Sequence, residues 1–194
     1  LVQLDAQYLN YLITYSKILK QRNAFLKNVH HPSEIDVDLL QIYNQQLLVP
    51  AAYLHQQRTA YLKQLQPLFN DYYRAISGDR EAVRFEYFSP LNNSTMQDLL
   101  VDSQERDIWL QRTTKGIHKD DMKLYIRDYP LKKNASQGQM KSYLLALKLA
   151  QYALLKKLST ILPILLLDDI FDKLDQIRVK NLLELLLNFE FGQI

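Results

Sequence analysis

The feature that most constrains the fold is an apolar run that ends on two adjacent carboxylates. Residues Ile161 to Leu167 are wholly apolar, and Asp168 and Asp169 follow directly. A continuous apolar run of this length is the form expected of a central strand in a parallel sheet. Ligands of open α/β sheets bind outside the carboxyl ends of the strands. We therefore expect a buried strand over 161–167 that presents the two carboxylates at its tip.

The carboxylate pair predicts a magnesium site. An ionised pair at the end of a buried strand is costly unless a cation or hydrogen-bond donors compensate it. P-loop ATPases use such a pair to hold Mg²⁺ and to position a water. We assign Asp168 to the magnesium shell and expect Asp169 to polarise the attacking water. The alternative is a helix N-cap beside a surface carboxylate.

A second candidate site is the turn formed by Ser136, Gln137, Gly138 and Gln139, which precedes a long apolar helical pattern. The N-terminus of a helix offers free N–H groups and the positive end of the helix dipole, so it binds anions. Ser136 adds a hydroxyl and an N-cap, and Gly138 lets a phosphate approach the backbone. The turn looks like the signature motif of ABC-type ATPases. The alternative is an ordinary capped helix start.

The chain lacks the loop that would hold the phosphates of a nucleotide. A P-loop has the form G-x-x-x-x-G-K-[ST], and none of the 4 Gly residues is followed by Lys-Ser or Lys-Thr. Residue 1 is Leu, and the first Met is Met96. We therefore expect the chain to be the C-terminal part of a larger ATPase, and expect this part alone to be inactive.

Composition excludes several other classes of site and partner. The chain has no Cys, so it has no disulfide or thiolate metal site, and a reducing cytoplasm is its natural setting. No apolar run approaches the roughly 18 residues of a membrane span. The net charge is only +3 and is spread along the chain, so any DNA contact must come from local patches. Lys132 and Lys133 are candidates for such a contact, although a solvated turn is the alternative.

Periodicity and turn residues predict the order of the elements. We expect helices over 5–28, 35–66, 67–76, 97–111, 137–158 and 175–189, and strands over 84–88, 122–126 and 161–167. Further short strands are expected up to Lys133 and from residue 191. Pro50 should kink or divide the second helix, Pro67 should open the next one, and Ser33 should cap the second. In the helix at 175–189 the residues expected to face inward are Ile177, Leu182, Leu183, Leu185 and Leu186.

These elements indicate an α/β fold with a helical lobe. Residues 1–80 are expected to form an antiparallel, arm-like helical lobe in which the many Tyr residues either pack the core or serve the arm. Residues 81–194 are expected to form the C-terminal part of an ABC-type ATPase domain, with signature motif, Walker B segment and D-loop.

The histidines give weaker signals. His118 lies in a polar loop, where it either contacts a phosphate or other group of the nucleotide or bonds to the backbone; the residues leave both open. The other histidines, at positions 30, 31 and 55, lack ligand partners at the spacing that a metal site requires.

Four segments, taken in order, resemble the RecF family of bacterial recombination ATPases in the ABC/SMC-like class. They are Lys20 to Ala24, Thr114 to Asp121, Ala135 to Gln139, and Leu165 to Asp175. The resemblance covers nearly the whole chain. It departs from the family pattern at Ile117, where Pro is usual, and at Asp172 and Lys173, where Ser and Glu are commoner.

The resemblance implies a protein that binds ATP with Mg²⁺, dimerises on it, and binds DNA at single-strand/double-strand junctions. It implies RecR and RecO as partners in loading RecA, in the cytoplasm and at the nucleoid. Asp168 and Asp169 would act on the nucleotide of their own subunit, and Asp175 would belong to the D-loop. The nucleotide of the partner subunit would be contacted by Ser136, Gly138 and Gln139.

Two other interpretations remain. The chain could come from another SMC-like or Rad50-like ATPase, although its short helical region without a long heptad array argues against this. It could also be a helical interaction module in which the Asp pair is structural. A P-loop in a preceding segment of the gene product would exclude the module.

Overall fold

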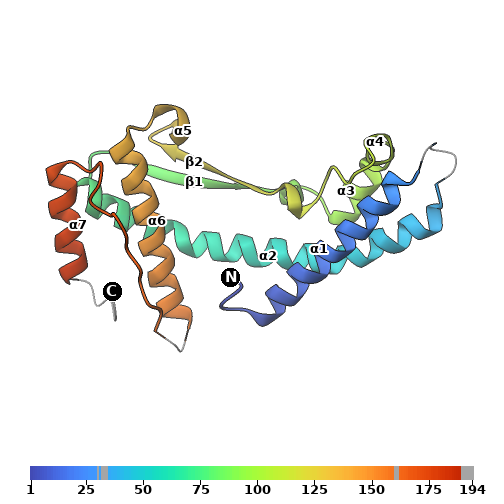
Figure 1. Cartoon of the computed structure of the whole chain (residues 1–194), viewed down its shortest axis with the longest axis horizontal. Coiled ribbons are helices and arrows are strands. Elements are labelled where there is room, and N and C mark those ends of the chain that lie inside the picture. The colour runs from blue at the N-terminus through green and yellow to red at the C-terminus, as the bar shows by residue number, and fades with distance from the viewer. Residues whose placement is uncertain (30, 32–34, 160–161, 189–194) are drawn as a thin grey trace. The chain divides into compact units, whose positions relative to one another are not determined.

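The computed structural model describes residues 1–29, 31, 35–159 and 162–188. The chain divides into two compact units (Figure 1). Unit 1 contains 1–60 and 87–121, and unit 2 contains 61–86 and 122–194. Each unit therefore combines two separate segments of the chain, and residue 80 lies inside one of them, 61–86. The sequence predicted a helical lobe at 1–80 and an ATPase part at 81–194. The two compact units do not test that boundary, and it stays a prediction.

Unit 1 is built on helix α1 (Ala6–Lys27), which confirms the predicted helix over 5–28. Asp5 caps it, because its carboxylate accepts a hydrogen bond from the backbone N–H of Tyr8 at 2.9 Å. Tyr residues belong to the core here, as one of the two interpretations expected. The buried apolar cluster consists of Tyr8, Tyr15, Ile18, Leu47, Ala51, Leu54, Met96, Leu100 and Ile117.

The predicted division at Pro50 and the predicted new helix at Pro67 are wrong, because one helix, α2 (Val37–Ser77), runs through both; the kink at Pro50 stays a prediction. A proline inside a helix removes one hydrogen bond and costs about 3 kcal/mol. Buried side chains on either side of each proline offset this cost, since tertiary packing supplies most helical stability. These side chains are Leu47, Ala51 and Leu54 around Pro50, and Leu65 and Phe69 around Pro67. Ser33, the expected cap, lies outside the described residues.

The single helix predicted over 97–111 is two short helices, α3 (Met96–Asp102) and α4 (Gln104–Trp109). Ser103 separates them and ends α3. Its hydroxyl donates to the buried carboxylate of Asp107 at 3.3 Å. A serine that bonds locally competes with helix continuation, which accounts for the break.

Unit 2 contains most of a three-stranded sheet of order β1-β2-β3. Strands β1 (Val83–Phe88) and β2 (Asp121–Ile126) confirm the predicted strands. Strand β3 (Tyr129–Pro130) pairs antiparallel with β2, with Ile126 opposite Tyr129. The strand expected up to Lys133 is wrong beyond Pro130, because residues from Leu131 form the helical turn α5 (Leu131–Asn134).

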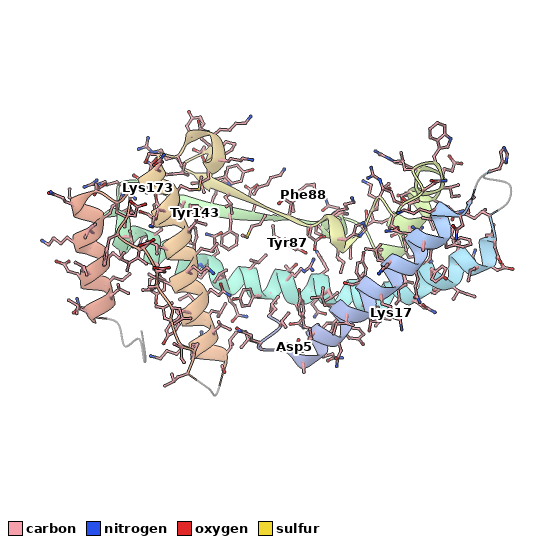
Figure 2. All side chains as sticks on the ribbon, viewed as in Figure 1. Asp5, Lys17, Tyr87, Phe88, Tyr143 and Lys173 are labelled. Carbon is pink, nitrogen blue, oxygen red and sulfur yellow. The ribbon has the colours of Figure 1, made fainter. Side chains whose placement is uncertain are left out.

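Helix α6 (Gln137–Leu158) has the bounds that the sequence predicted, and α7 (Gln176–Asn188) follows it. Tyr143 of α6 (Figure 2) packs on Phe69 with 4.6 Å between ring centroids, and its hydroxyl donates to the carbonyl of Arg84 at 2.9 Å. On α7 the inward face is narrower than predicted. Leu182 and Leu185 are buried, but Ile177 and Leu183 are 51% and 43% exposed.

The structure assigns no strand to the apolar run at 162–167, so that prediction is wrong for these residues. Leu165 is buried, whereas Leu162, Ile164 and Leu166 are exposed by 62%, 62% and 87%. A strand needs a hydrogen-bonded neighbour, and none of the strands in the described ranges pairs with this run. Residue 161 and the strand expected from 191 lie outside the described residues. No helix in the described part of the chain combines the length and apolar character of a membrane span.

Candidate functional site

The turn at Ser136 begins α6 with a capping box. The Ser136 hydroxyl accepts from the backbone N–H of Gln139 at 3.2 Å, and the Gln139 side chain accepts from the N–H of Ser136 at 2.8 Å. Ser136 and Gln137 are exposed. The first N–H groups of a helix have no partner within it, and here those of Gln137 and Gly138 find no acceptor in the described ranges. The turn therefore has the donors that an anion site requires.

Gly138 lies against the backbone of the segment that leads into α7. A Cβ added to Gly138 would lie 3.0 Å from the carbonyl oxygen of Lys173. A side chain here would thus press on the backbone of the chain's own loop. The sequence predicted that a phosphate approaches the backbone at Gly138. In the structure the carbonyl oxygen of Lys173 lies close to Gly138, and the phosphate contact stays a prediction.

The acidic pair lies on the loop between the apolar run and α7. Asp168 and Asp169 are exposed, and neither carboxylate has a hydrogen bond or ion pair with another described residue. Asp169 adopts a left-handed backbone conformation with φ 48°, which costs a non-glycine residue of the order of 1–2 kcal/mol. Its carbonyl oxygen accepts a hydrogen bond from the Lys141 ammonium of α6, which ties the loop to that helix.

The donor chemistry of this pair fits Mg²⁺ held through a nucleotide. No group of three or more His, Cys, Asp or Glu side chains that could hold a metal is found among the residues that the structure describes. Mg²⁺ commonly takes only one or two carboxylates and completes its shell with water and phosphate oxygens. Two exposed, unpaired carboxylates are therefore a suitable but partial shell.

Asp175 caps α7. Its carboxylate accepts from the backbone N–H of Arg178 at 2.9 Å and from the Arg178 Nε at 3.2 Å, and Arg80 lies 3.9 Å away. The backbone hydrogen bond from Arg178, helped by the nearby guanidinium groups, lowers the pKa of Asp175. The predicted D-loop residue is thus held in a fixed position by its own helix.

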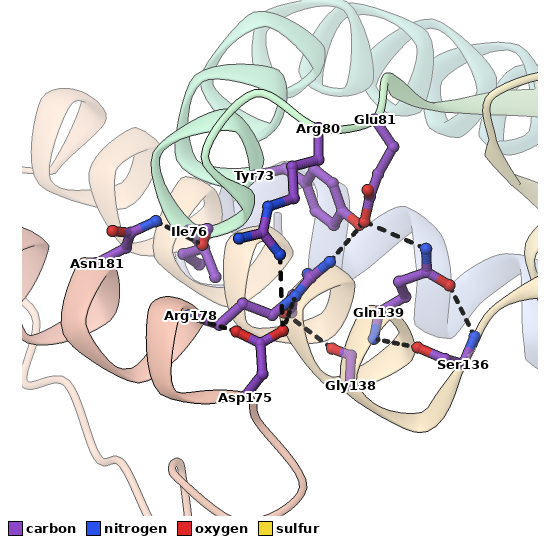
Figure 3. Close-up of polar contacts among 11 residues, drawn as sticks. Tyr73, Ile76, Arg80, Glu81, Ser136, Gly138, Gln139, Asp175, Arg178 and Asn181 are labelled. Carbon is purple, nitrogen blue, oxygen red and sulfur yellow. Dashed lines mark hydrogen bonds and ion pairs between the residues drawn. The ribbon is translucent and has the colours of Figure 1, made fainter.

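Two residues that sequence reasoning missed connect these parts, as Figure 3 shows. The Arg178 guanidinium donates to Glu81 Oε1 at 2.6 Å. It also donates to the Ser142 hydroxyl at 2.9 Å. The same Glu81 oxygen accepts from Gln139 Nε2 at 3.3 Å and from the Tyr73 hydroxyl at 3.0 Å. The side chains of Arg178 and Glu81 are only 5% and 4% exposed.

The pKa directions agree with this geometry. Burial alone would raise the pKa of Glu81, but hydrogen bonds from Arg178 and Tyr73 outweigh it and the pKa is lowered. Burial, together with the carboxylate of Glu81, raises the pKa of Tyr73 to about 12. One signal in the sequence could have found Arg178: it occupies the same helical stripe as Leu182 and Leu185, where a cation is unusual.

In unit 1, His118 fits the second of its two interpretations. Its Nδ1 lies 2.9 Å from the Tyr15 hydroxyl, and its Nε2 lies 3.1 Å from the carbonyl oxygen of Thr113. Because a carbonyl only accepts, Nε2 carries the proton and Nδ1 accepts from Tyr15. Burial lowers the pKa of His118, which favours the neutral ring, and both nitrogens have a hydrogen-bond partner.

The segment Lys20 to Ala24 joins the same polar loop through buried bonds. The Arg22 side chain is fully buried and donates to Asp107 at 2.9 Å, to the Thr113 hydroxyl at 2.7 Å and to Asn44 at 2.8 Å. Asn23 Oδ1 accepts from the backbone N–H and the hydroxyl of Thr113, both at 2.8 Å. The backbone N–H and the hydroxyl of Thr114 also donate to Asp107, at 2.8 and 2.6 Å, so two of the four segments that carry the resemblance share one buried network in unit 1.

Asp120, in the same loop, forms a second ion pair. Its carboxylate accepts from the Arg58 guanidinium and from the Tyr87 hydroxyl, the latter at 2.5 Å. Tyr87 is marked in Figure 2. Lys132 and Lys133 are both exposed on α5, so a DNA contact and a solvated turn both remain open for them.

Comparison with known proteins identifies the group to which the chain belongs. No protein-family model matches it. A relative named "DNA replication and repair protein RecF" from Flavobacterium johnsoniae is 45% identical over 192 residues, which is 99% of this chain and 54% of the relative. The protein of the same name from Cytophaga hutchinsonii is 44% identical over 192 residues, 99% of this chain and 51% of the relative.

Solved structures agree with these relatives. The "Structure of the recombination mediator protein RecF-ATP in RecFOR pathway" matches with a TM-score of 0.81 and 28% identity, over 96% of this chain and 52% of that one. The chain spans about half the length of the curated relatives it matches. On sequence and fold together, the chain belongs to the RecF family and corresponds to about half of a RecF protein.

Proposed function

We propose that this chain is the signature-bearing and acidic part of an ATP-dependent DNA replication and repair protein. The observation that carries the proposal is the packing of the Ser136–Gln139 turn against the loop that carries Asp168, Asp169 and Asp175, with the carbonyl of Lys173 3.0 Å from the Cβ position of Gly138. The names of the curated relatives support it, as does the match to a solved structure of RecF with ATP.

Each part of the site has a distinct task. Asp168 would hold Mg²⁺ on the nucleotide of its own subunit, where the ion neutralises charge on the phosphates. Asp169 would orient the attacking water and accept its proton. Ser136, Gly138 and Gln139 would direct hydroxyl, backbone and amide donors toward the nucleotide of the partner subunit. Asp175 would hold the D-loop turn in place through its cap of α7.

The phosphate-cradling loop is not among these 194 residues. It would be supplied by the other half of the longer protein, so this chain by itself should not hydrolyse ATP. We further propose the boundary near residue 80 as the limit between an arm-like lobe and the ATPase part.

The proposed setting is the cytoplasm, at the nucleoid. DNA junctions are the proposed substrate, with Lys132 and Lys133 as candidate contacts to phosphates. RecR and RecO are proposed partners that act with the dimer to load RecA. The solved RecF structure that this chain matches is described as part of the RecFOR pathway, which supports this assignment.

The in-trans role of the signature turn can be tested in the full-length protein. Ser136→Arg should leave ATP binding by the monomer nearly unchanged but abolish ATP-dependent dimerisation and turnover, because a bulky cation blocks the approach to the turn. Mixing it with a variant that lacks the P-loop lysine should restore one working site per heterodimer. Gln151→Arg, which adds the same charge at an exposed position of α6, is the matched control. Normal dimerisation by Ser136→Arg would reduce the turn to a helix cap.

A further inference from the structure

The buried ion pair of Glu81 and Arg178 touches two segments that the proposed function treats separately. On one side, Glu81 Oε1 accepts from Gln139, whose other end closes the capping box on Ser136 (Figure 3). On the other side, Arg178 holds the carboxylate of Asp175 through its Nε and its backbone N–H. One ion pair therefore lies between the signature turn and the D-loop turn.

A third contact of Arg178 reaches the signature helix itself. Its Nη1 donates to the Ser142 hydroxyl at 2.9 Å, and that hydroxyl donates in turn to the carbonyl of Gly138 at 2.8 Å. Arg178 thus reaches Gly138 through one intermediate side chain and Gln139 through another. A displacement of Arg178 would change the position of both turns together.

Stability alone gives little reason to keep such a pair. Removing two charges from water costs several kcal/mol per ion, and replacing a buried pair by apolar residues of similar size is often neutral or stabilising. The Glu81–Arg178 pair is about 5% exposed on both sides. A fold that needed only packing at this point could use Leu and Met instead.

We propose that Glu81 and Arg178 are positioning residues that couple the signature turn at Ser136–Gln139 to the D-loop turn at Asp175. The inference rests on the proposed function, because it assigns both turns to the ATP-dependent dimer. In that dimer the pair fixes the spacing between the turn that contacts the partner's nucleotide and the turn that carries Asp175. Loss of the pair uncouples the two turns without removing a group that touches the nucleotide.

A double apolar variant separates positioning from stability. In the full-length protein, Glu81→Leu combined with Arg178→Met removes both charges while filling the space. We expect kcat for ATP to fall about tenfold or more with KM changed less than about threefold, since the change affects the transition-state arrangement more than nucleotide affinity. Its melting temperature should stay close to that of the parent protein. The control is Lys180→Met with Glu184→Leu, which removes an exposed pair on the same helix and should leave kcat unchanged.

Hydrogen exchange provides a second measurement that needs no turnover and no intact double variant. Glu81→Gln keeps the shape of the side chain and removes its charge. We expect exchange of the backbone amides to accelerate about tenfold in both 136–142 and 173–178, because the two turns share one anchor. Glu184→Gln, an exposed change on α7, should alter neither segment.

The outcomes distinguish this inference from the proposed function. If the parent protein hydrolyses ATP and the double apolar variant keeps a kcat within about twofold of it, the coupling is wrong and the proposed function stands. Acceleration of exchange in only one segment, or in neither, likewise overturns the coupling. If the parent protein shows neither ATP-dependent dimerisation nor turnover, the proposed function fails and the inference fails with it.

Discussion

The replacement Arg22→Met tests the buried network of unit 1. The Arg22 side chain is 0% exposed, and its partner Asp107 is 1% exposed, with 2.9 Å between Nη1 and Oδ2. Met matches the length of the aliphatic stem but supplies no donor. The change removes the hydrogen bonds to Asp107, Thr113 and Asn44 at once and leaves the carboxylate of Asp107 without its cation.

The magnitude follows from what Asp107 retains. Breaking a buried ion pair by removing one partner typically costs about 3–5 kcal/mol. Asp107 keeps hydrogen bonds from the backbone N–H of Thr114 at 2.8 Å, from the Thr114 hydroxyl at 2.6 Å and from Ser103 at 3.3 Å. These remaining donors place the cost at the lower end, about 3 kcal/mol. A compact unit has only about 5–15 kcal/mol of stability, so this loss is large but leaves the unit folded.

Native-state hydrogen exchange, followed on peptides of α1 and α4, measures this loss within unit 1. A loss of about 3 kcal/mol corresponds to exchange faster by more than a hundredfold in amides that exchange through opening of the unit. Arg106→Met is the matched control within the same unit, because Arg106 is exposed on α4 and its side chain has no ion pair with another described residue. Exposed charges of this kind contribute about 0–1 kcal/mol. Equal effects of the two substitutions would refute the assignment of Arg22 as the central group of the network.

Three further outcomes are expected. Burial lowers the pKa of His118 in the folded chain. The unfolded chain therefore binds a proton on this ring at higher pH, and the free energy of unfolding falls as the pH drops below about 6.5. His118→Gln should reduce this pH dependence, as urea titrations at several pH values would show. Gly116→Ala should lower the melting temperature clearly more than Gly78→Ala. Both glycines have positive φ, but only a Cβ at Gly116 would lie 2.6 Å from the Tyr15 hydroxyl; equal decreases in melting temperature would contradict this. In the full-length protein Asp168→Asn should weaken magnesium-dependent nucleotide binding, whereas Asp169→Asn should mainly slow hydrolysis and prolong the ATP-bound dimer; equal loss of affinity in both would refute the division of roles.

Local rules in the sequence determined the elements whose signals are short-range. The Ser136 cap, the bounds of α6 and the strands at 83–88 and 121–126 all follow from capping residues and from periodicity within a few residues. The order of the motifs along the chain was sufficient to identify the family. Adjacent carboxylates after an apolar run also form a local pattern, which singled out Asp168 and Asp169, and their role in a magnesium site stays a prediction.

Contacts between distant segments decided the rest. Pro50 and Pro67 remain inside α2 because packing outweighs a local preference that acts against the helix. The run at 162–167 shows why strand propensity alone is insufficient, since a strand also needs a neighbour to accept its hydrogen bonds.

The buried ion pairs also join residues that are far apart in the sequence. Glu81 and Arg178 are 97 residues apart, and Arg22 and Asp107 are 85 residues apart. A charged residue carries no local sign of the partner it will meet, because the partner is chosen by the packing of whole helices. The sequence therefore determined the chemistry that the chain carries, and the tertiary structure decided which charges are buried together and which two turns they connect.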